Sequence, residues 1–248
     1  MEEIMQKFET QKKTIEENMD FIISNLRRMD GPIFIELMGT PKSGKTTLVK
    51  HLQALFSKRG VALDKRRETA EYNPIDNKGI EEYNVWMIME LMKNLSEDIS
   101  NTDPRIVLYD RGMLDRIPWI ETSVRDGSFP AKDAEIFKRL YDSEFMEKYK
   151  PLSYGFVTSP EISVLRKGKE GRLVNRKTIG EFNDSFAKSV PYISDKSGRY
   201  SQVITDSYQG NLNGFIMDMA EKVTGDVREV MQDRLTKRKK EAPDFDEK

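Results

Sequence analysis

The chain has 248 residues, enough for one large or two small domains. Its 41 lysines and arginines nearly cancel its 42 aspartates and glutamates, so we expect no extended nucleic-acid surface. The absence of cysteine excludes disulfides, thiolate zinc sites and a cysteine nucleophile, and the single histidine, His51, excludes a histidine-rich metal site. No apolar run approaches the roughly 20 residues of a membrane helix and no signal-peptide core is found, so we expect a cytoplasmic protein that does not contact a membrane.

The first segment, Met1–Arg28, is predicted to be a helix, because apolar residues recur at helical spacing with charges between them. Residues 1–30 would then form a helical extension before the first strand. The apolar face of this helix must pack on its own domain, on a second copy of the chain or on another protein. A homodimer or a partner protein at this helix is therefore left open.

Strands and helices are predicted to alternate after this extension. Ile33–Met38 is a short apolar stretch between a proline and a glycine, which predicts a buried strand, and the helix that follows ends at Gly60. Further strands are predicted at Val61–Arg67, Arg105–Asp110, Tyr154–Thr158 and Gln202–Thr205. Further helices are predicted at Ile80–Ile99, at Pro130–Tyr149, after the capping residue Ser159, and from about Asn211 onward.

This alternation predicts an α/β fold with a doubly wound parallel sheet of five strands and helices on both faces. Right-handed crossovers would bring the carboxyl ends of the strands to one edge, where ligands bind. We expect the α/β domain to cover residues 31–225 and a charged helix or tail to cover residues 226–248.

Residues 39–46 match the phosphate-binding pattern G-x-x-x-x-G-K-[ST] in full, between a predicted strand and a predicted helix. Backbone N–H groups and the helix N-terminus would hold the phosphates of ATP. Lys45 would reach the β- and γ-phosphates, and the hydroxyl of Thr46 would be a ligand of Mg²⁺. The residues expected to bind the nucleotide are Gly39, Thr40, Pro41, Lys42, Ser43, Gly44, Lys45, Thr46 and Thr47.

Charged residues follow the second and third predicted strands, at the edge where the phosphates would lie. After the second strand, the carboxylate of Glu68 could accept a proton from an attacking hydroxyl, and Arg67 could hold an anionic group of the acceptor. Asp110 closes the third strand in the manner of a magnesium-binding aspartate, and Arg111 would point into the same crevice. Asp115 and Arg116, about one turn later, could line the same cleft, and Asp115 is a candidate contact to the acceptor.

This order of motifs resembles the thymidylate kinase and deoxynucleoside kinase group of P-loop phosphotransferases, from about Ile33 to Ile204. Thymidylate kinases carry Arg-Glu-Pro and Asp-Arg at the two strand ends, and deoxynucleoside kinases carry a glutamate base and then Glu-Arg-Ser. Here Glu68 is followed by Thr69 instead of proline, and position 110 is aspartate instead of glutamate. The chain therefore matches neither subgroup throughout, and the acceptor stays undetermined.

The resemblance also implies a mobile lid, which here would be the basic, glycine-containing loop over residues 166–177. Arg166 and Arg172 would bring positive charge onto the transferring phosphoryl group as the loop closes. The alternative for this loop is a solvated basic segment without a catalytic role.

The long helix Ile80–Ile99 would flank the acceptor pocket in this group. Asn84 and Trp86 near its start, and Tyr72 just before it, are candidates for binding a flat base by stacking and by one amide. A stripe of methionine and tryptophan is also typical of a plain core, so both interpretations are kept.

Two functions follow from these observations. The first is a phosphotransferase that depends on Mg²⁺ and ATP and phosphorylates a small acceptor, a nucleoside or a nucleoside monophosphate. Its catalytic residues would be Lys45, Glu68, Asp110, Arg111, Arg166 and Arg172. The second is a P-loop ATPase that acts as a nucleotide-dependent switch, which the N-terminal helix favours. A GTPase is disfavoured because no Asn-Lys-x-Asp motif is present.

Overall fold

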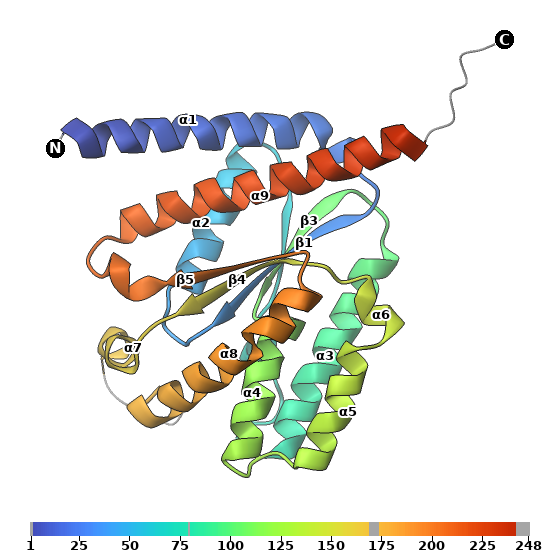
Figure 1. The fold of residues 1–248 in the computed structure, drawn as a ribbon, viewed down its shortest axis with the longest axis vertical. Helices are drawn as coiled ribbons and strands as arrows, with labels where there is room; N and C mark the ends of the chain where they lie inside the picture. The colour runs from blue at the N-terminus through green and yellow to red at the C-terminus, as the bar shows by residue number, and fades with distance from the viewer. Residues whose placement is uncertain (1, 79, 169–173, 242–248) are drawn as a thin grey trace.

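The computed structural model describes residues 2–78, 80–168 and 174–241 (Figure 1). At its centre is a five-stranded parallel sheet with the strand order β2-β3-β1-β4-β5. The strands are β1 (Pro32–Gly39), β2 (Leu63–Arg66), β3 (Arg105–Asp110), β4 (Leu152–Val157) and β5 (Arg199–Ile204). The predicted parallel sheet is confirmed, and its central strand leads directly into the 39–46 loop.

Helices cover both faces of the sheet (Figure 1). One face carries α2 (Lys45–Lys58) and α9 (Leu212–Glu241), with α1 (Glu2–Asn25) outside α9; the other carries α3 (Glu81–Ser100), α4 (Met113–Arg125), α5 (Ala131–Tyr141) and α8 (Arg176–Lys196). Alternate side chains of β1 pack on opposite faces of the sheet. Ile35 packs with α1, α2 and α9, whereas Phe34 packs with α3, α4 and α8. A strand that is covered on both faces reads as a continuous apolar run, which is why β1 was predictable.

Two helical regions differ from the prediction. The sequence analysis does not predict α4, which contains Pro118, a residue that lacks the N–H needed for the helical hydrogen bond. The helix predicted over Pro130–Tyr149 is instead two helices, α5 and α6 (Glu144–Glu147). The backbone N–H of Asp142 bonds back to carbonyl oxygens in the last turn of α5, and this turn ends the helix.

The first and last helices of the described chain pack against each other (Figure 1). Ile15 and Met19 of α1 share one core with Val227 and Met231 of α9. The apolar face of α1 therefore packs on its own domain. None of the helices in the described ranges is long and apolar enough to cross a membrane.

Candidate active site

The 39–46 loop has a backbone that only glycine permits at its start. Gly39 has a φ of 109°, and a Cβ there would collide with the carbonyl oxygen of Phe156 on β4. Gly44, at the other end of the loop, has a φ of 97° and is followed by the first residue of α2. The two glycines of the motif thus let the loop turn tightly between β1 and α2, as phosphate binding requires.

Neighbouring elements fix the conformation of this loop through its second and third residues. The hydroxyl of Thr40 donates to Asn183 Oδ1 of α8 at 2.7 Å and accepts from the N–H of Thr158 at 3.2 Å. The hydroxyl of Ser163, on α7 (Pro160–Lys167), donates to the carbonyl of Pro41 at 2.7 Å. The loop is therefore held in place by contacts with β4, α7 and α8, which favours binding without a large rearrangement.

Lys45, which is predicted to contact the phosphates, is buried beneath the 39–46 loop. Its ammonium group donates to the carbonyls of Gly39 at 3.1 Å and Thr40 at 2.7 Å, and to Ser43 Oγ at 3.0 Å. Burial, and after it the positive charge of Arg111, lowers the pKa of Lys45 to about 7. A bound phosphate would favour the charged form, so the site is electrostatically suited to an anion.

Thr46 and Asp110 lie together at the mouth of the loop. The hydroxyl of Thr46 donates to Asp110 Oδ2 at 3.2 Å, while Asp110 Oδ1 is buried and has no hydrogen-bond partner in the structure. Mg²⁺ prefers such oxygen ligands and is usually held by one or two protein groups together with phosphates. The Thr46 hydroxyl and the unpartnered Asp110 Oδ1 therefore fit a magnesium ion that is shared with a nucleotide.

Arg111 joins the two charged strand ends. Its Nε lies 3.1 Å from Glu68 Oε1, and its Nη1 donates to Asp115 Oδ2 at 2.9 Å and to the carbonyl of Gly39 at 3.1 Å. Although burial disfavours the charge, the carboxylates of Asp115 and Glu68 raise the pKa of Arg111 above its usual range. The structure thus brings Glu68, Arg111 and the loop into one connected cluster.

Asp115 is fully buried behind this cluster. Its Oδ1 accepts from the backbone N–H of Gly39 at 2.7 Å, and its Oδ2 accepts from Arg111 and from Arg116 at 3.0 Å. Burial opposes ionisation, but the two guanidinium groups hold the pKa of Asp115 below its usual value. Its position suits the support of the loop and of Arg111 better than contact with an acceptor.

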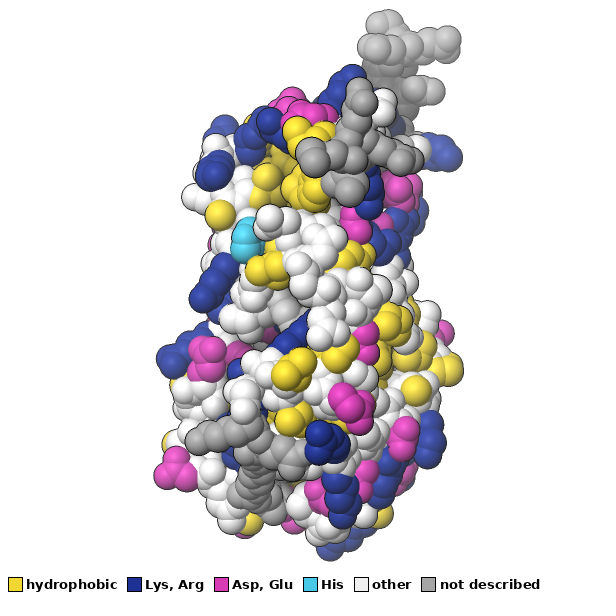
Figure 2. All heavy atoms as spheres, turned by 90° about the vertical axis from the view of Figure 1, so that its left-hand side faces the viewer, with side chains coloured by type: hydrophobic (Ala, Val, Ile, Leu, Met, Phe, Trp, Pro, Cys, Tyr) yellow, Lys and Arg dark blue, Asp and Glu magenta, His cyan; other side chains and the backbone are white. Residues whose placement is uncertain are grey.

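Two hollows meet at this cluster on the carboxyl edge of the sheet. Figure 2 turns this edge toward the viewer, where basic and acidic side chains are interspersed with apolar ones. The phosphate-loop hollow is lined by residues 41–47 and by Glu68, Asp110, Arg111, Arg166, Thr205, Tyr208, Gly210, Leu212 and Phe215. The second hollow is lined by residues that include Lys42, Glu68, Tyr83, Asn84, Arg111, Arg116, Trp119, Thr122 and Asp126.

The structure separates the residues that were predicted to contact the acceptor into two groups. Asn84 lines the second hollow, and its Nδ2 is buried without a hydrogen-bond partner. Tyr72 and Trp86 pack edge to face with ring centroids 5.6 Å apart, and the guanidinium of Arg67 lies 5.2 Å from the Tyr72 ring centroid. These three side chains form a separate cluster and line neither hollow.

The predicted lid is described only in part. Arg166, at the end of α7, lines the phosphate-loop hollow and donates to the carbonyls of Lys42 and Thr205, each at 3.2 Å. Arg172 lies outside the described residues. The described part of the lid thus places one of the two predicted arginines beside the loop.

No protein-family model and no curated protein matches the sequence. Among solved structures, deoxyadenosine kinase from M. mycoides with bound dCTP matches with a TM-score of 0.59 and 15% identity, over 78% of this chain and 100% of that chain. The same enzyme with bound dATP matches with a TM-score of 0.58 and 15% identity, over 77% and 99%. This chain has the P-loop kinase fold. The predicted fold is confirmed.

Trp119, a lining residue of the second hollow, escaped the sequence analysis. It lies on α4, the helix that contains Pro118, and its indole nitrogen is buried without a hydrogen-bond partner. The signal that could have found it is the sequence after the Asp-Arg pair, where a helix must follow β3 in a doubly wound fold. Arg116, on the same helix, lines this hollow too, and its Nε is buried without a hydrogen-bond partner.

Glu36 is a further residue that the sequence analysis missed. It lies in the middle of β1, where its Oε1 accepts from the N–H of Asp115 at 2.8 Å and its Oε2 from the hydroxyl of Tyr149 at 2.7 Å. Gly112 makes room for it, since a Cβ there would lie 2.7 Å from Glu36 Cδ. Burial raises the pKa of Glu36 to about 7. A glutamate inside an apolar strand was the available signal.

The Glu36→Gln variant is expected to gain stability relative to the wild type as the pH rises. The carboxyl has an ordinary pKa of 4.5 and a folded-state pKa of about 7, so folding disfavours its ionised form. The wild type therefore loses stability from this group between pH 4.5 and pH 7, by about 3 kcal/mol, and the amide does not. Urea unfolding of both proteins at pH 5 and pH 8 measures this change.

Glu97→Gln, an exposed substitution on α3, is the control and is expected to change little at either pH. An equal stability difference between Glu36→Gln and the wild type at both pH values would contradict the assignment of a raised pKa to Glu36.

Proposed function

We propose that this protein is a cytoplasmic kinase that uses Mg²⁺ and ATP to phosphorylate a nucleoside or a nucleoside monophosphate. The observation that carries the proposal is that Glu68 and Arg111 line both hollows. A carboxylate and a guanidinium at the junction of two hollows suit transfer between two bound molecules, whereas hydrolysis needs no second hollow. The deoxyadenosine kinase fold, found with products dCMP and dCDP bound, supports a nucleoside acceptor.

The donor side of the proposed site consists of the loop, Lys45, Thr46 and Asp110. Loop N–H groups and the start of α2 would bind the phosphates, and Lys45 would contact the β- and γ-phosphates. Thr46 and Asp110 would hold Mg²⁺, which when bound neutralises charge on the phosphates. Arg166 would add a positive charge at the wall of the phosphate-loop hollow.

The acceptor side is the second hollow, with Glu68 at its boundary. The acceptor hydroxyl oxygen forms a bond to the γ-phosphorus, the bond from that phosphorus to the β–γ bridging oxygen breaks, and ADP leaves. The hydroxyl proton passes to the carboxylate of Glu68, the general base. Arg111 stabilises the negative charge on the transferring group, because Glu68 and Asp115 hold its guanidinium at the junction.

Incubation of the protein with γ-labelled ATP and a panel of nucleosides, nucleoside monophosphates and other small hydroxyl compounds tests the proposal. We expect label on at least one nucleoside or nucleoside monophosphate. Release of labelled phosphate without any labelled acceptor would reject the kinase and favour the ATPase switch. Label only on compounds that lack a nucleobase would keep the kinase and reject the acceptor class.

Glu68→Gln is expected to lower kcat for a nucleoside acceptor by about 10²- to 10⁴-fold, because the amide cannot take the hydroxyl proton. The amide oxygen can still accept from Arg111, so we expect the affinity for ATP to change less than about threefold. With a monophosphate acceptor, whose attacking oxygen carries no proton to remove, the loss in kcat is expected to be much smaller. Steady-state kinetics with both acceptor types measure the two effects.

Glu71→Gln is the matched control, because Glu71 lies three residues further along, pairs with Arg67 at 3.3 Å and lines neither hollow. Its kcat is expected to equal that of the wild type. An unchanged kcat of Glu68→Gln with a nucleoside would show that Glu68 is not the base.

A further inference from the structure

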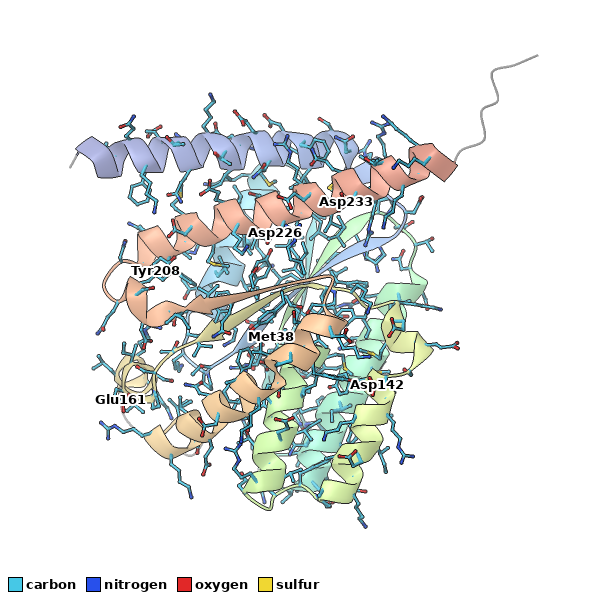
Figure 3. The ribbon with its side chains drawn as sticks, in the orientation of Figure 1. Met38, Asp142, Glu161, Tyr208, Asp226 and Asp233 are labelled. Atoms are coloured by element: carbon cyan, nitrogen blue, oxygen red, sulfur yellow. The ribbon has the colours of Figure 1, made fainter. Side chains whose placement is uncertain are left out.

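Tyr208 forms part of the wall of the phosphate-loop hollow. It ends the short 3-10 helix Thr205–Tyr208 after β5 and lies close to the start of α9 (Figure 3). Its ring packs edge to face on Phe215 with centroids 5.3 Å apart, and a Cβ on Gly44 would lie 3.3 Å from the Phe215 ring. A shift of Tyr208 would therefore disturb the wall of the hollow and the aromatic contact behind the loop.

One carboxylate, Asp218 of α9, connects Tyr208 to the N-terminal helix. Asp218 Oδ2 accepts from the Tyr208 hydroxyl at 2.9 Å. Asp218 Oδ1 accepts from Gln11 Nε2 at 2.7 Å and from Lys7 Nζ at 3.2 Å, both from α1. Although burial opposes ionisation, the hydrogen bonds from Gln11, Tyr208 and Lys7 hold the pKa of Asp218 below its usual value.

Gln11 is the buried member of this chain of contacts. It is 6% exposed and stands on the apolar stripe of α1 between Phe8 and Ile15, where a hydrophobic residue would pack without cost. Burying an unpaired amide is unfavourable, and here two carboxylates, Asp218 and Glu221 at 2.9 Å, satisfy its N–H groups. One of the two acceptors of Gln11 on α9, Asp218, thus also binds Tyr208.

We propose that Gln11 is a positioning residue of the nucleotide site: through Asp218 it fixes Tyr208, so the seating of α1 on α9 and nucleotide binding strengthen each other. The inference rests on the proposed function only in requiring that the phosphate-loop hollow binds a nucleotide. A nucleotide that needs Tyr208 in its place binds more weakly when α1 is displaced. By reciprocity, the same free energy holds α1 more firmly when the nucleotide is bound.

A second polar contact on the same helix pair provides a matched control. Asn18, also on α1 and 5% exposed, donates from Nδ2 to Thr224 Oγ1 at 3.3 Å and accepts from Arg228 at 3.2 Å. None of these three residues lines the phosphate-loop hollow. Gln11→Leu and Asn18→Leu thus both remove a buried polar contact between α1 and α9, but only the first leads to Tyr208.

The test is a titration of each protein with a fluorescent ATP derivative. We expect Gln11→Leu and Tyr208→Phe each to raise Kd by about 3- to 10-fold, and the double variant to raise it no further, because both changes break one chain of contacts. Asn18→Leu is expected to stay within about twofold of the wild type. Hydrogen exchange adds an independent readout: ATP is expected to slow exchange of backbone amides 5–14 in the wild type and not in Gln11→Leu.

An equal Kd for Gln11→Leu and Asn18→Leu would overturn the inference, as would additive effects of Gln11→Leu and Tyr208→Phe. Unchanged exchange in α1 on addition of ATP would also overturn it, while leaving the kinase proposal intact. If the wild type itself did not bind the ATP derivative, both the proposed nucleotide site and this inference would be rejected.

Discussion

Replacement of Lys45 by methionine is expected to lower kcat/KM for ATP by about 10³-fold or more. The side chain is nearly isosteric but lacks the charge that the buried lysine places beneath the loop, where two carbonyls and Ser43 already hold its ammonium. In a site that excludes water, such a charge stabilises the developing phosphate charge more strongly than it would in solution. Kinetics with the acceptor identified by the panel assay measure the loss.

The same residue gives the wild type a defined pH dependence. Burial lowers the pKa of Lys45 to about 7 in the free protein, and a bound triphosphate raises it, so binding takes up a proton above pH 7. The Kd for ATP is therefore expected to rise as the pH increases above 7, by up to about tenfold per pH unit. Titration calorimetry at pH 8 in two buffers of different ionisation enthalpy would detect the proton uptake.

Lys50→Met is the control for both measurements, because Lys50 is exposed on the same helix and lines neither hollow. It is expected to keep the kinetics and the pH dependence of the wild type. If Kd for ATP still depended on pH in Lys45→Met, the titrating group would be another residue. Full activity of Lys45→Met would show that the 39–46 loop does not act as the proposed mechanism requires.

Asp115→Ala is expected to lower the free energy of unfolding by about 3–5 kcal/mol, because it leaves two buried guanidinium groups without their shared partner. Arg111 and Arg116 both bond to Asp115 Oδ2, and the backbone N–H of Gly39 bonds to its Oδ1. Asp115→Asn keeps an acceptor for the Gly39 N–H but loses the charge, so an intermediate loss is expected. Urea unfolding of the three proteins gives these differences.

Asp20→Asn serves as the comparison, since Asp20 is 68% exposed and pairs with Arg59 at 2.9 Å on the surface. Exposed ion pairs contribute about 0–1 kcal/mol, so this variant is expected to unfold almost as the wild type does. A loss below about 1 kcal/mol in Asp115→Ala would contradict the supporting role that we assign to Asp115.

The donor half of the candidate site can be proposed from the sequence because it follows from local patterns. A strand, a complete phosphate-binding motif and a helix stand next to each other in the chain, and parallel strands must bring Glu68 and Asp110 to the same edge. The structure indeed brings Glu68 and Arg111 into direct contact, 3.1 Å apart.

The acceptor half depends on which way side chains turn in the packed molecule, and sequence proximity does not determine that direction. Tyr72 and Trp86 lie near Asn84 in sequence, yet their rings pack on each other and away from the hollow that Asn84 lines. Trp119 lies on α4, a helix that the sequence analysis does not predict. The buried hydrogen bonds of Glu36 join residues far apart in the chain, so no local pattern could reveal them.

The packing of α1 against α9 also determines when the protein can finish folding. Contacts between the two helices join residues more than 200 positions apart, such as Asn18 and Thr224. During synthesis, Ile15 and Met19 must remain without their helical partner until α9 has left the ribosome. One face of the sheet therefore closes only after α9 has been synthesised, and a chain that stopped before Leu212 would leave an apolar surface open to aggregation.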